Sequence, residues 1–149
     1  MRIKKNDKVF VLRYNDNFIT DSMGLHKAIC DELGYCWYGK AGKKPNVERI
    51  ANYIEDGEPK ILFYSRKARY IGNLTEFSVV APEIGFPDYY GKSMWKPSSW
   101  FKVTGLEELE SDILEKLVID STGKSMKETI NSSMTSFYFT TAKEDLMPL

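Results

Sequence analysis

Runs of β-branched and aromatic residues alternate along the chain with stretches whose apolar positions recur at helical spacing. The first run, Lys8–Tyr14, predicts a strand closed by turn-forming residues. Asp21 or Ser22 can then cap a helix that stops at Gly34. The apolar positions of this helix are Leu25, Ala28, Ile29 and Leu33.

The next segment predicts a short strand, a second helix and a hairpin. The strand is Tyr35–Trp37, and Pro45 suits the first position of a helix that ends before Gly57. The apolar stripe of this helix is Val47, Ile50, Ala51 and Ile54. Lys60–Ser65 and Arg69–Phe77 then read as neighbouring strands joined by a tight basic turn. We expect this hairpin to form the centre of a sheet.

The following segment begins with a long loop, because residues 81–97 are rich in Pro, Gly, Tyr and Ser. Ser99–Val103 predicts another strand. Apolar residues from Leu106 to Leu117 recur at helical spacing after it, with Thr104 and Glu107 as a capping box. This spacing predicts a third long helix.

The last predicted strand is Ser136–Thr141, and the polar residues 142–149 continue no pattern. A chain of 149 residues is the size of one domain, so residues 1–141 are expected to form a single domain, followed by a tail or the start of a linker.

Five to six strands and about three helices, unevenly spaced, predict an α+β fold. Its core would be a curved mixed or antiparallel sheet, or a small barrel, with helices on the outside.

The composition narrows the class of protein. The chain is 42% hydrophobic and 28% charged, which is typical of a soluble globular protein, and its apolar runs are too short to span a bilayer. Residues 1–5 lead directly into a strand-like run, which favours a protein that stays in the cytoplasm. Cys30 and Cys36 define no disulfide framework, in agreement with that location.

The charge is balanced in total but uneven along the chain. Residues 40–73 hold eight Lys or Arg against four acids, whereas residues 74–120 hold nine acids against four Lys. One interpretation is an ordinary solvated face. The other is a phosphate-contacting patch, whose candidates are Lys40, Lys43, Lys44, Arg66, Lys67 and Arg69.

Catalytic and metal-binding patterns are weak. His26 is the single histidine, and its spacing to Cys30 and Cys36 matches no familiar zinc site, so a satisfied surface or helix-face histidine is favoured. Gly123–Ser125 resembles the end of a phosphate-binding loop, but Val118 stands where that motif requires glycine. We therefore expect a turn there, no metal, no cofactor and no catalysis by this chain.

The aromatic residues carry more information. Trp37 and Trp95 each lie where an apolar run gives way to a Lys-containing loop, a setting that suggests exposed rings able to stack on a flat ligand. Tyr89 and Tyr90 share the long loop with Trp95 and could supply another wall. Trp100 alternates with core positions and is expected to be structural.

The order of these pieces resembles the YTH and EVE branch of the PUA-like superfamily over residues 9–109. The resemblance rests on the Trp37 strand, the Val/Ile-rich helix, and the segments Lys60–Ser65, Tyr70–Thr75 and Trp100–Leu109. In YTH domains, a tryptophan on a short strand and aromatics in a later loop form a cage around a flipped N6-methyladenine.

By position, the resemblance makes Trp37 the first wall of such a cage, Trp95 a loop wall, and Tyr90 or Tyr89 the remaining one. Gly39 replaces a small hydroxyl residue of YTH domains, so contacts to the base edge, and the choice among modified bases, stay open.

The resemblance also implies partners. Domains of this branch occur at the N-terminus of larger machines, including the GTP-driven McrB subunits of modification-dependent restriction systems. The expected partner is DNA with a modified base, and a GTPase and nuclease assembly could join through a C-terminal continuation. Three alternatives stay open: an RNA-binding PUA-like module, a small enzyme using Cys30 or Cys36, and a protein-interaction module in which Trp37 and Trp95 fill a partner's pocket.

Overall fold

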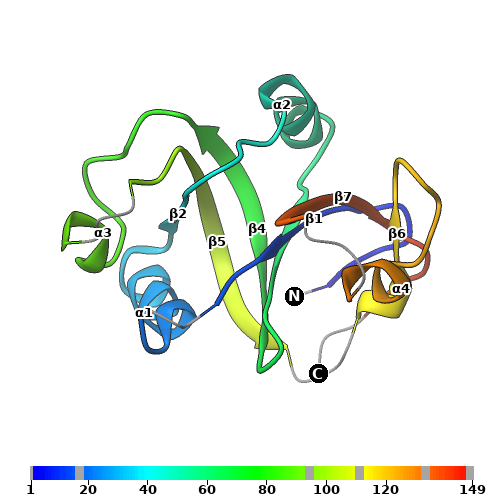
Figure 1. Ribbon diagram of the computed structural model, residues 1–149, viewed down its shortest axis with the longest axis horizontal. Helices are drawn as coiled ribbons and strands as arrows, with labels where there is room; N and C mark the ends of the chain where they lie inside the picture. Colours follow the sequence, from blue (N-terminus) through cyan, green and yellow to red (C-terminus); the bar gives the residue numbers. More distant parts are fainter. Residues whose placement is uncertain (1, 16–18, 93–95, 110–112, 132–134, 147–149) are drawn as a thin grey trace. The chain divides into compact units, whose positions relative to one another are not determined.

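The computed structural model describes residues 2–15, 19–92, 96–109, 113–131 and 135–146. The strands within these ranges (Figure 1) are β1 (Lys8–Arg13), β2 (Cys36–Lys40), β3 (Lys60–Tyr64), β4 (Arg69–Ser78), β5 (Ser99–Leu109), β6 (Leu117–Ile119) and β7 (Phe137–Ala142). The helices are α1 (Ser22–Leu33), α2 (Val47–Glu55), α3 (Tyr89–Lys92) and α4 (Met126–Ile130), with a 3-10 turn, η1 (Leu114–Lys116).

The strands form one mixed, open sheet in the order β2-β5-β4-β3-β1-β7-β6. The strands β1 and β3 are parallel, whereas β7 is antiparallel to both of its neighbours, β1 and β6, and β2 is antiparallel to β5. The predicted α+β class is thus confirmed. The sheet has seven strands rather than five or six, because the short strand β6 carries too few residues to show a period.

The chain divides into two compact units. Unit 1 comprises residues 1–14, 59–72 and 107–149, and unit 2 comprises residues 15–58 and 73–106. Each unit is described by itself below.

Unit 1 is built on β1, which is buried on both faces. The side chains of β1 from Val9 to Leu12 are all fully buried. On one face, Phe10 stacks on Phe137 at 5.8 Å and meets Phe139 edge-on at 5.2 Å. The other face joins a hydrophobic cluster formed by Ile3, Val9, Val11, Leu62, Ile71, Leu109, Ile113, Leu114, Leu117, Ile119, Met126, Ile130, Tyr138 and Ala142. Burial on both faces explains why β1 reads as a continuous apolar run.

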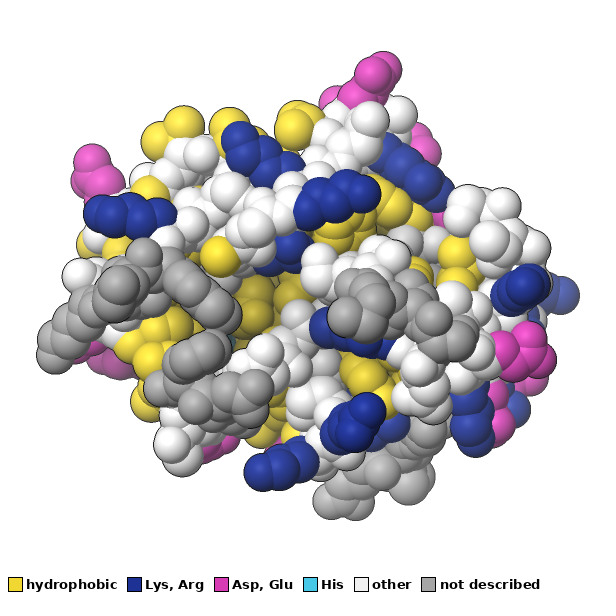
Figure 2. Space-filling view, viewed as in Figure 1, with side chains coloured by type: hydrophobic (Ala, Val, Ile, Leu, Met, Phe, Trp, Pro, Cys, Tyr) yellow, Lys and Arg dark blue, Asp and Glu magenta, His cyan; other side chains and the backbone are white. Residues whose placement is uncertain are grey.

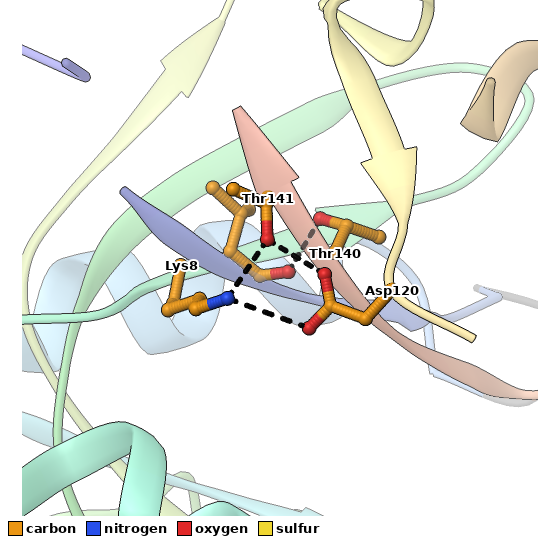
Figure 3. Close-up of polar contacts among 5 residues, drawn as sticks. Lys8, Asp120, Thr140 and Thr141 are labelled. Carbon is orange, nitrogen blue, oxygen red and sulfur yellow. Dashed lines mark hydrogen bonds and ion pairs between the residues drawn. The ribbon is translucent and has the colours of Figure 1, made fainter. Parts of the chain in front are cut away.

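Polar contacts between the strands of unit 1 surround the ends of β1 and β7 (Figure 3). Lys8 Nζ donates to the Thr141 hydroxyl over 3.0 Å, and that hydroxyl donates to Asp120 over 2.6 Å. Lys8 and Asp120 also form an ion pair at 3.7 Å. The Thr140 hydroxyl, which is buried, donates to the Val9 carbonyl over 2.6 Å. These contacts stabilise the register in which β7 pairs with β1.

The predicted tail is part of unit 1 as far as Leu146. The backbone of Leu146 exchanges two hydrogen bonds with Ile3, of 2.7 and 3.0 Å. The Asp145 carboxylate accepts from the Lys5 backbone over 2.8 Å. Polar composition suggested a tail, but backbone pairing with the N-terminal segment, which no local pattern reveals, holds residues 142–146 in place. Residues 147–149 lie outside the described range.

The predicted helix over Leu106–Leu117 is wrong. Strand β5 instead continues to Leu109, and η1 and β6 follow. Gly105 has φ of 60°, a left-handed conformation that interrupts the alternation of the strand. Leu106 and Leu109 are then both buried three residues apart, which imitates helical spacing.

Both predicted helices of unit 2 are confirmed, but their starts differ from the prediction, because Asp21 makes no side-chain cap on α1 and α2 begins at Val47, after Pro45. Gly34 ends α1 with φ of 86° and donates its N–H to the Cys30 carbonyl over 2.8 Å. The Asn46 side chain begins α2 by accepting from the Arg49 backbone over 2.9 Å. Helix α1 packs beside β2 (Figure 1). Unit 2 thus places α1 next to the strand that carries Trp37.

Candidate functional site

Strand β2 is the last strand in the sheet order, so one of its edges is not paired with another strand. Residues 85–90, which lead into α3, lie along that edge. The Trp37 N–H donates to the Gly85 carbonyl over 2.7 Å, and the Gly39 N–H donates to the Tyr90 hydroxyl over 2.9 Å. Because these N–H groups are two residues apart, they point to the same side of the strand. The long loop is therefore fastened along the strand that the sequence singled out.

The ring of Trp37 is buried, with 9% of the residue exposed. Gly85 has φ of 92° and lies so close that a Cβ there would be 2.6 Å from the Tyr35 ring and 3.3 Å from the Trp37 ring. The expectation of an exposed Trp37 is wrong, because the loop backbone closes over the ring. Trp95, the second predicted wall, lies outside the described residues.

Gly39 is required by a close approach from the next strand. A Cβ at this position would lie 2.7 Å from the Pro97 ring and 2.9 Å from the Trp100 ring. A hydroxyl-bearing residue would therefore force the Pro97 and Trp100 rings to shift. This contact gives a physical reason for the glycine that departs from the YTH pattern.

Tyr90 is held by a chain of hydrogen bonds that includes His26. The Ser22 carbonyl lies 2.7 Å from His26 Nδ1, so Nδ1 carries the proton and Nε2 is an acceptor. The Tyr90 hydroxyl, 2.8 Å from Nε2, then donates to it while accepting from Gly39. Helix α1, strand β2 and helix α3 are thus joined through one phenol.

His26 is a hydrogen-bonded histidine on helix α1, as predicted, but it is fully buried, so the surface form of that prediction is wrong. Burial lowers the pKa of His26 from 6.5 to about 4, although its bond to Ser22 opposes the shift. Burial also raises the pKa of Tyr90 well above its usual range. Both groups are therefore neutral near pH 7, as the donor and acceptor pattern requires.

An aromatic cluster surrounds this relay. The Tyr89 and Tyr90 ring centroids are 4.4 Å apart, and Tyr90 lies 4.9 Å from Trp100. His26 lies 5.1 Å from Tyr38 and 6.0 Å from Tyr89. Tyr89 and Tyr90 are both partly exposed at the margin of this cluster. The structure thus brings the two predicted loop tyrosines to the edge of β2.

The lysines after Trp37 have two different roles. Lys40 is buried, and its ammonium donates to the carbonyls of Ala41 and Lys43 over 3.1 and 2.7 Å. Burial lowers the pKa of Lys40, and the charge of Lys43 adds to the shift. Lys40 therefore shapes the loop, whereas Lys43 and Lys44 are exposed and accessible to an anion.

The other predicted cations belong to unit 1. Arg66 and Lys67 are exposed on the turn between β3 and β4, and the Arg69 guanidinium lies 4.8 Å above the Tyr64 ring. On the face drawn in Figure 2, Lys and Arg side chains stand in separate spots among uncharged and apolar ones. The predicted cations are thus divided between the two units, with Lys40, Lys43 and Lys44 in unit 2 and Arg66, Lys67 and Arg69 in unit 1.

The cysteines do not form a catalytic pair with His26. Cys30 and Cys36 are free and buried. A hydrogen bond with Cys36 is the main cause that lowers the pKa of Cys30 to about 6, and the same bond raises the pKa of Cys36. Both His26 nitrogens are engaged by Ser22 and Tyr90, so the imidazole is not available as a base for either thiol.

The described part of the chain holds neither a metal-binding cluster nor a membrane-spanning helix. No group of three or more His, Cys, Asp or Glu side chains there could hold a metal ion. In the same part of the chain, no helix has the length and apolar character needed to cross a membrane. The chain matches no family model, no curated protein and no solved structure.

Proposed function

We propose that this chain is a nucleic-acid-binding module of PUA-like, YTH/EVE type that recognises a modified base, N6-methyladenine foremost, in a flipped or single-stranded position. It would serve inside the cell as the DNA-targeting part of a modification-dependent restriction system, with catalysis in another domain or subunit. The chain itself binds and does not react.

One observation carries this proposal. The loop that bears Tyr89 and Tyr90 is fastened to the edge of β2, the strand that bears Trp37, through backbone and phenol hydrogen bonds. The contact between these segments, some fifty residues apart in sequence, supports a base site formed by Trp37, Tyr89 and Tyr90. A flat base that enters here would meet the partly exposed tyrosines first, and it would reach Trp37 after displacement of the Gly85 segment.

The energetics of such a site are modest and measurable. Stacking on aromatic side chains contributes about 1–3 kcal/mol per base, comparable with the cost of unstacking it. One added methyl contributes about 0.8 kcal/mol when buried, which is about fourfold in affinity. Lys43 and Lys44 would contact phosphates and add affinity that falls as salt rises.

The test is a binding titration with single-stranded oligonucleotides that differ only in one N6-methyladenine, in DNA and RNA versions. Tyr89→Ala removes a partly exposed ring and should weaken binding of the methylated strand about fivefold or more. Trp37→Ala should do the same if it folds. Equal affinity of wild type and Tyr89→Ala for the methylated strand contradicts the proposal.

The lysines offer a matched pair of variants. Changing both Lys43 and Lys44 to Gln should lower the slope of log affinity against log salt by about one to two. Changing Lys124 and Lys143 to Gln removes the same charge from exposed positions in unit 1 and serves as the control. An equal effect of both pairs would show that only total charge matters.

A further inference from the structure

Unit 1 contains a pocket at the carboxyl ends of its two parallel strands. The strands β1 and β3 pair in parallel up to the partners Arg13 and Tyr64, and the Tyr14 N–H extends the pairing by donating to the Tyr64 carbonyl over 2.9 Å. The pocket has a volume of about 240 Å³ and is lined by Arg13, Tyr14, Tyr64, Ser65, Arg66, Ile130 and Asn131. The carboxyl ends of neighbouring parallel strands are a frequent location for ligands.

The charge of the pocket lining is one-sided. Two arginines line it, and none of the lining residues that the structure describes is acidic. The Arg69 guanidinium lies 4.8 Å above the ring of Tyr64, a lining residue, and so adds a third positive charge near the pocket. The pocket therefore favours an anion.

Arg13, which lines this pocket, has a side-chain donor without a partner in the part of the chain that the structure describes. Among the described residues, its Nε atom is buried and has no hydrogen-bond partner. A buried charged donor without an acceptor costs free energy, and an anionic oxygen would remove that cost. The position of Arg13 is itself fixed, because its backbone N–H donates to the Ser136 carbonyl over 2.9 Å.

The turn that carries Arg66 is fixed by Ser65. The Ser65 hydroxyl accepts from the backbones of Lys67 and Ala68 over 3.3 and 3.1 Å, and the Ser65 N–H donates to the Ala68 carbonyl over 3.0 Å. Ser65 therefore shapes the turn and does not serve as a donor to a ligand. Arg66, which is exposed, is left to reach an anion from this turn.

From these features we propose that the pocket binds a phosphate group, either as the free ion or as a monoester. Two guanidinium groups and the Asn131 amide present more donors than the two oxygens of a carboxylate can accept, whereas a terminal phosphate has three free oxygens. The volume lies below the roughly 300–1,000 Å³ of pockets that enclose a drug-sized molecule. The pocket therefore has room for the phosphate and for little of the group attached to it. The tyrosines at the wall would contact the group that carries it.

The phosphate could come from a strand end, a nucleotide or the free ion, and the test separates these sources. The full chain is titrated with inorganic phosphate, with a nucleoside 5′-monophosphate, and with one oligonucleotide in 5′-phosphorylated and 5′-hydroxyl forms, all at matched ionic strength. Thermal shift and calorimetry report binding. A preference for the phosphorylated oligonucleotide supports a strand end, and equal saturable binding of the small ligands supports free phosphate or nucleotide.

Two variants and a control make the test decisive. Arg13→Gln and Arg66→Gln should each weaken phosphate binding about tenfold or more, because each removes a charge-assisted donor. Lys124→Gln removes the same charge from an exposed turn of unit 1 and should leave binding unchanged. Without phosphate, Arg13→Gln should melt no earlier than wild type, since its Nε bonds to no described residue.

The result that overturns the proposal is an absence of saturable phosphate binding, or equal binding in wild type and Arg66→Gln. Base recognition and phosphate binding can fail separately. Tyr89→Ala, which alters the proposed base site in unit 2, should leave binding of inorganic phosphate unchanged.

Discussion

The buried His26, hydrogen-bonded to Tyr90, predicts a specific acid dependence of stability. The folded protein holds His26 neutral with a pKa of about 4, against 6.5 for a free histidine. A group whose pKa is lower in the folded protein than in the unfolded chain makes its full contribution to the free energy of unfolding at pH values above the unfolded pKa. That contribution is lost as the pH falls from 6.5 toward 4, because the unfolded chain takes up a proton that the folded chain refuses.

The magnitude follows from the two pKa values. The free energy of unfolding falls by about 3 kcal/mol once His26 is protonated in both the folded and the unfolded state, and by about 2.5 kcal/mol already at about pH 4.5. Carboxylates titrate in the same range, so wild type alone does not isolate the histidine. His26 is the single histidine of the chain, and His26→Gln therefore removes the whole imidazole contribution.

The assay is urea unfolding of wild type and His26→Gln at about pH 7 and about pH 4.5, with free energies from linear extrapolation. Wild type should lose about 2.5 kcal/mol more than the variant between these conditions. The fixed cost of the substitution cancels in this difference. Equal losses in the two proteins would refute the buried, neutral imidazole and the donor pattern derived from it.

Three further substitutions test packing and polar contacts by urea unfolding. Tyr90→Phe leaves the Gly39 N–H and His26 Nε2 without their partner and should cost about 1–3 kcal/mol, and no measurable loss would show that the relay is absent. Gly39→Ala should cost about 1–3 kcal/mol, because its Cβ would lie 2.7 Å from Pro97, and a neutral effect would contradict that close approach. Leu62→Ala in the fully buried core of unit 1 should cost about 2–5 kcal/mol, and a smaller loss would mean that the cluster around it is loosely packed.

Features with a local cause could be predicted from the sequence. The end of α1 follows from Gly34, whose left-handed conformation stops the helix, whereas the cap that begins α2 is Asn46 and not the position that Pro45 indicates. The apolar run of β1 is equally local. The second half of β5 escaped prediction, because the glycine at position 105 shifts the buried positions to a spacing that helices also show.

Features that depend on distant pairing could not be predicted. The buried His26 bonds to Tyr90, which lies 64 residues later in the chain, and nothing near His26 in sequence indicates this contact. Trp37 was recognised as a site candidate from its setting, but its burial depends on the approach of Gly85. Arg13 escaped attention as a strand-end residue, since the pocket around it is assembled from three separate segments.

The most direct test of the central claim is the affinity ratio for one single-stranded oligonucleotide with and without a single N6-methyladenine. We expect wild type to bind the methylated strand at least about fourfold more tightly, from burial of the methyl group. We expect Tyr89→Ala to lose most of that preference while remaining folded. A ratio of one in wild type, or an unchanged ratio in Tyr89→Ala, would contradict recognition of this modified base beside β2.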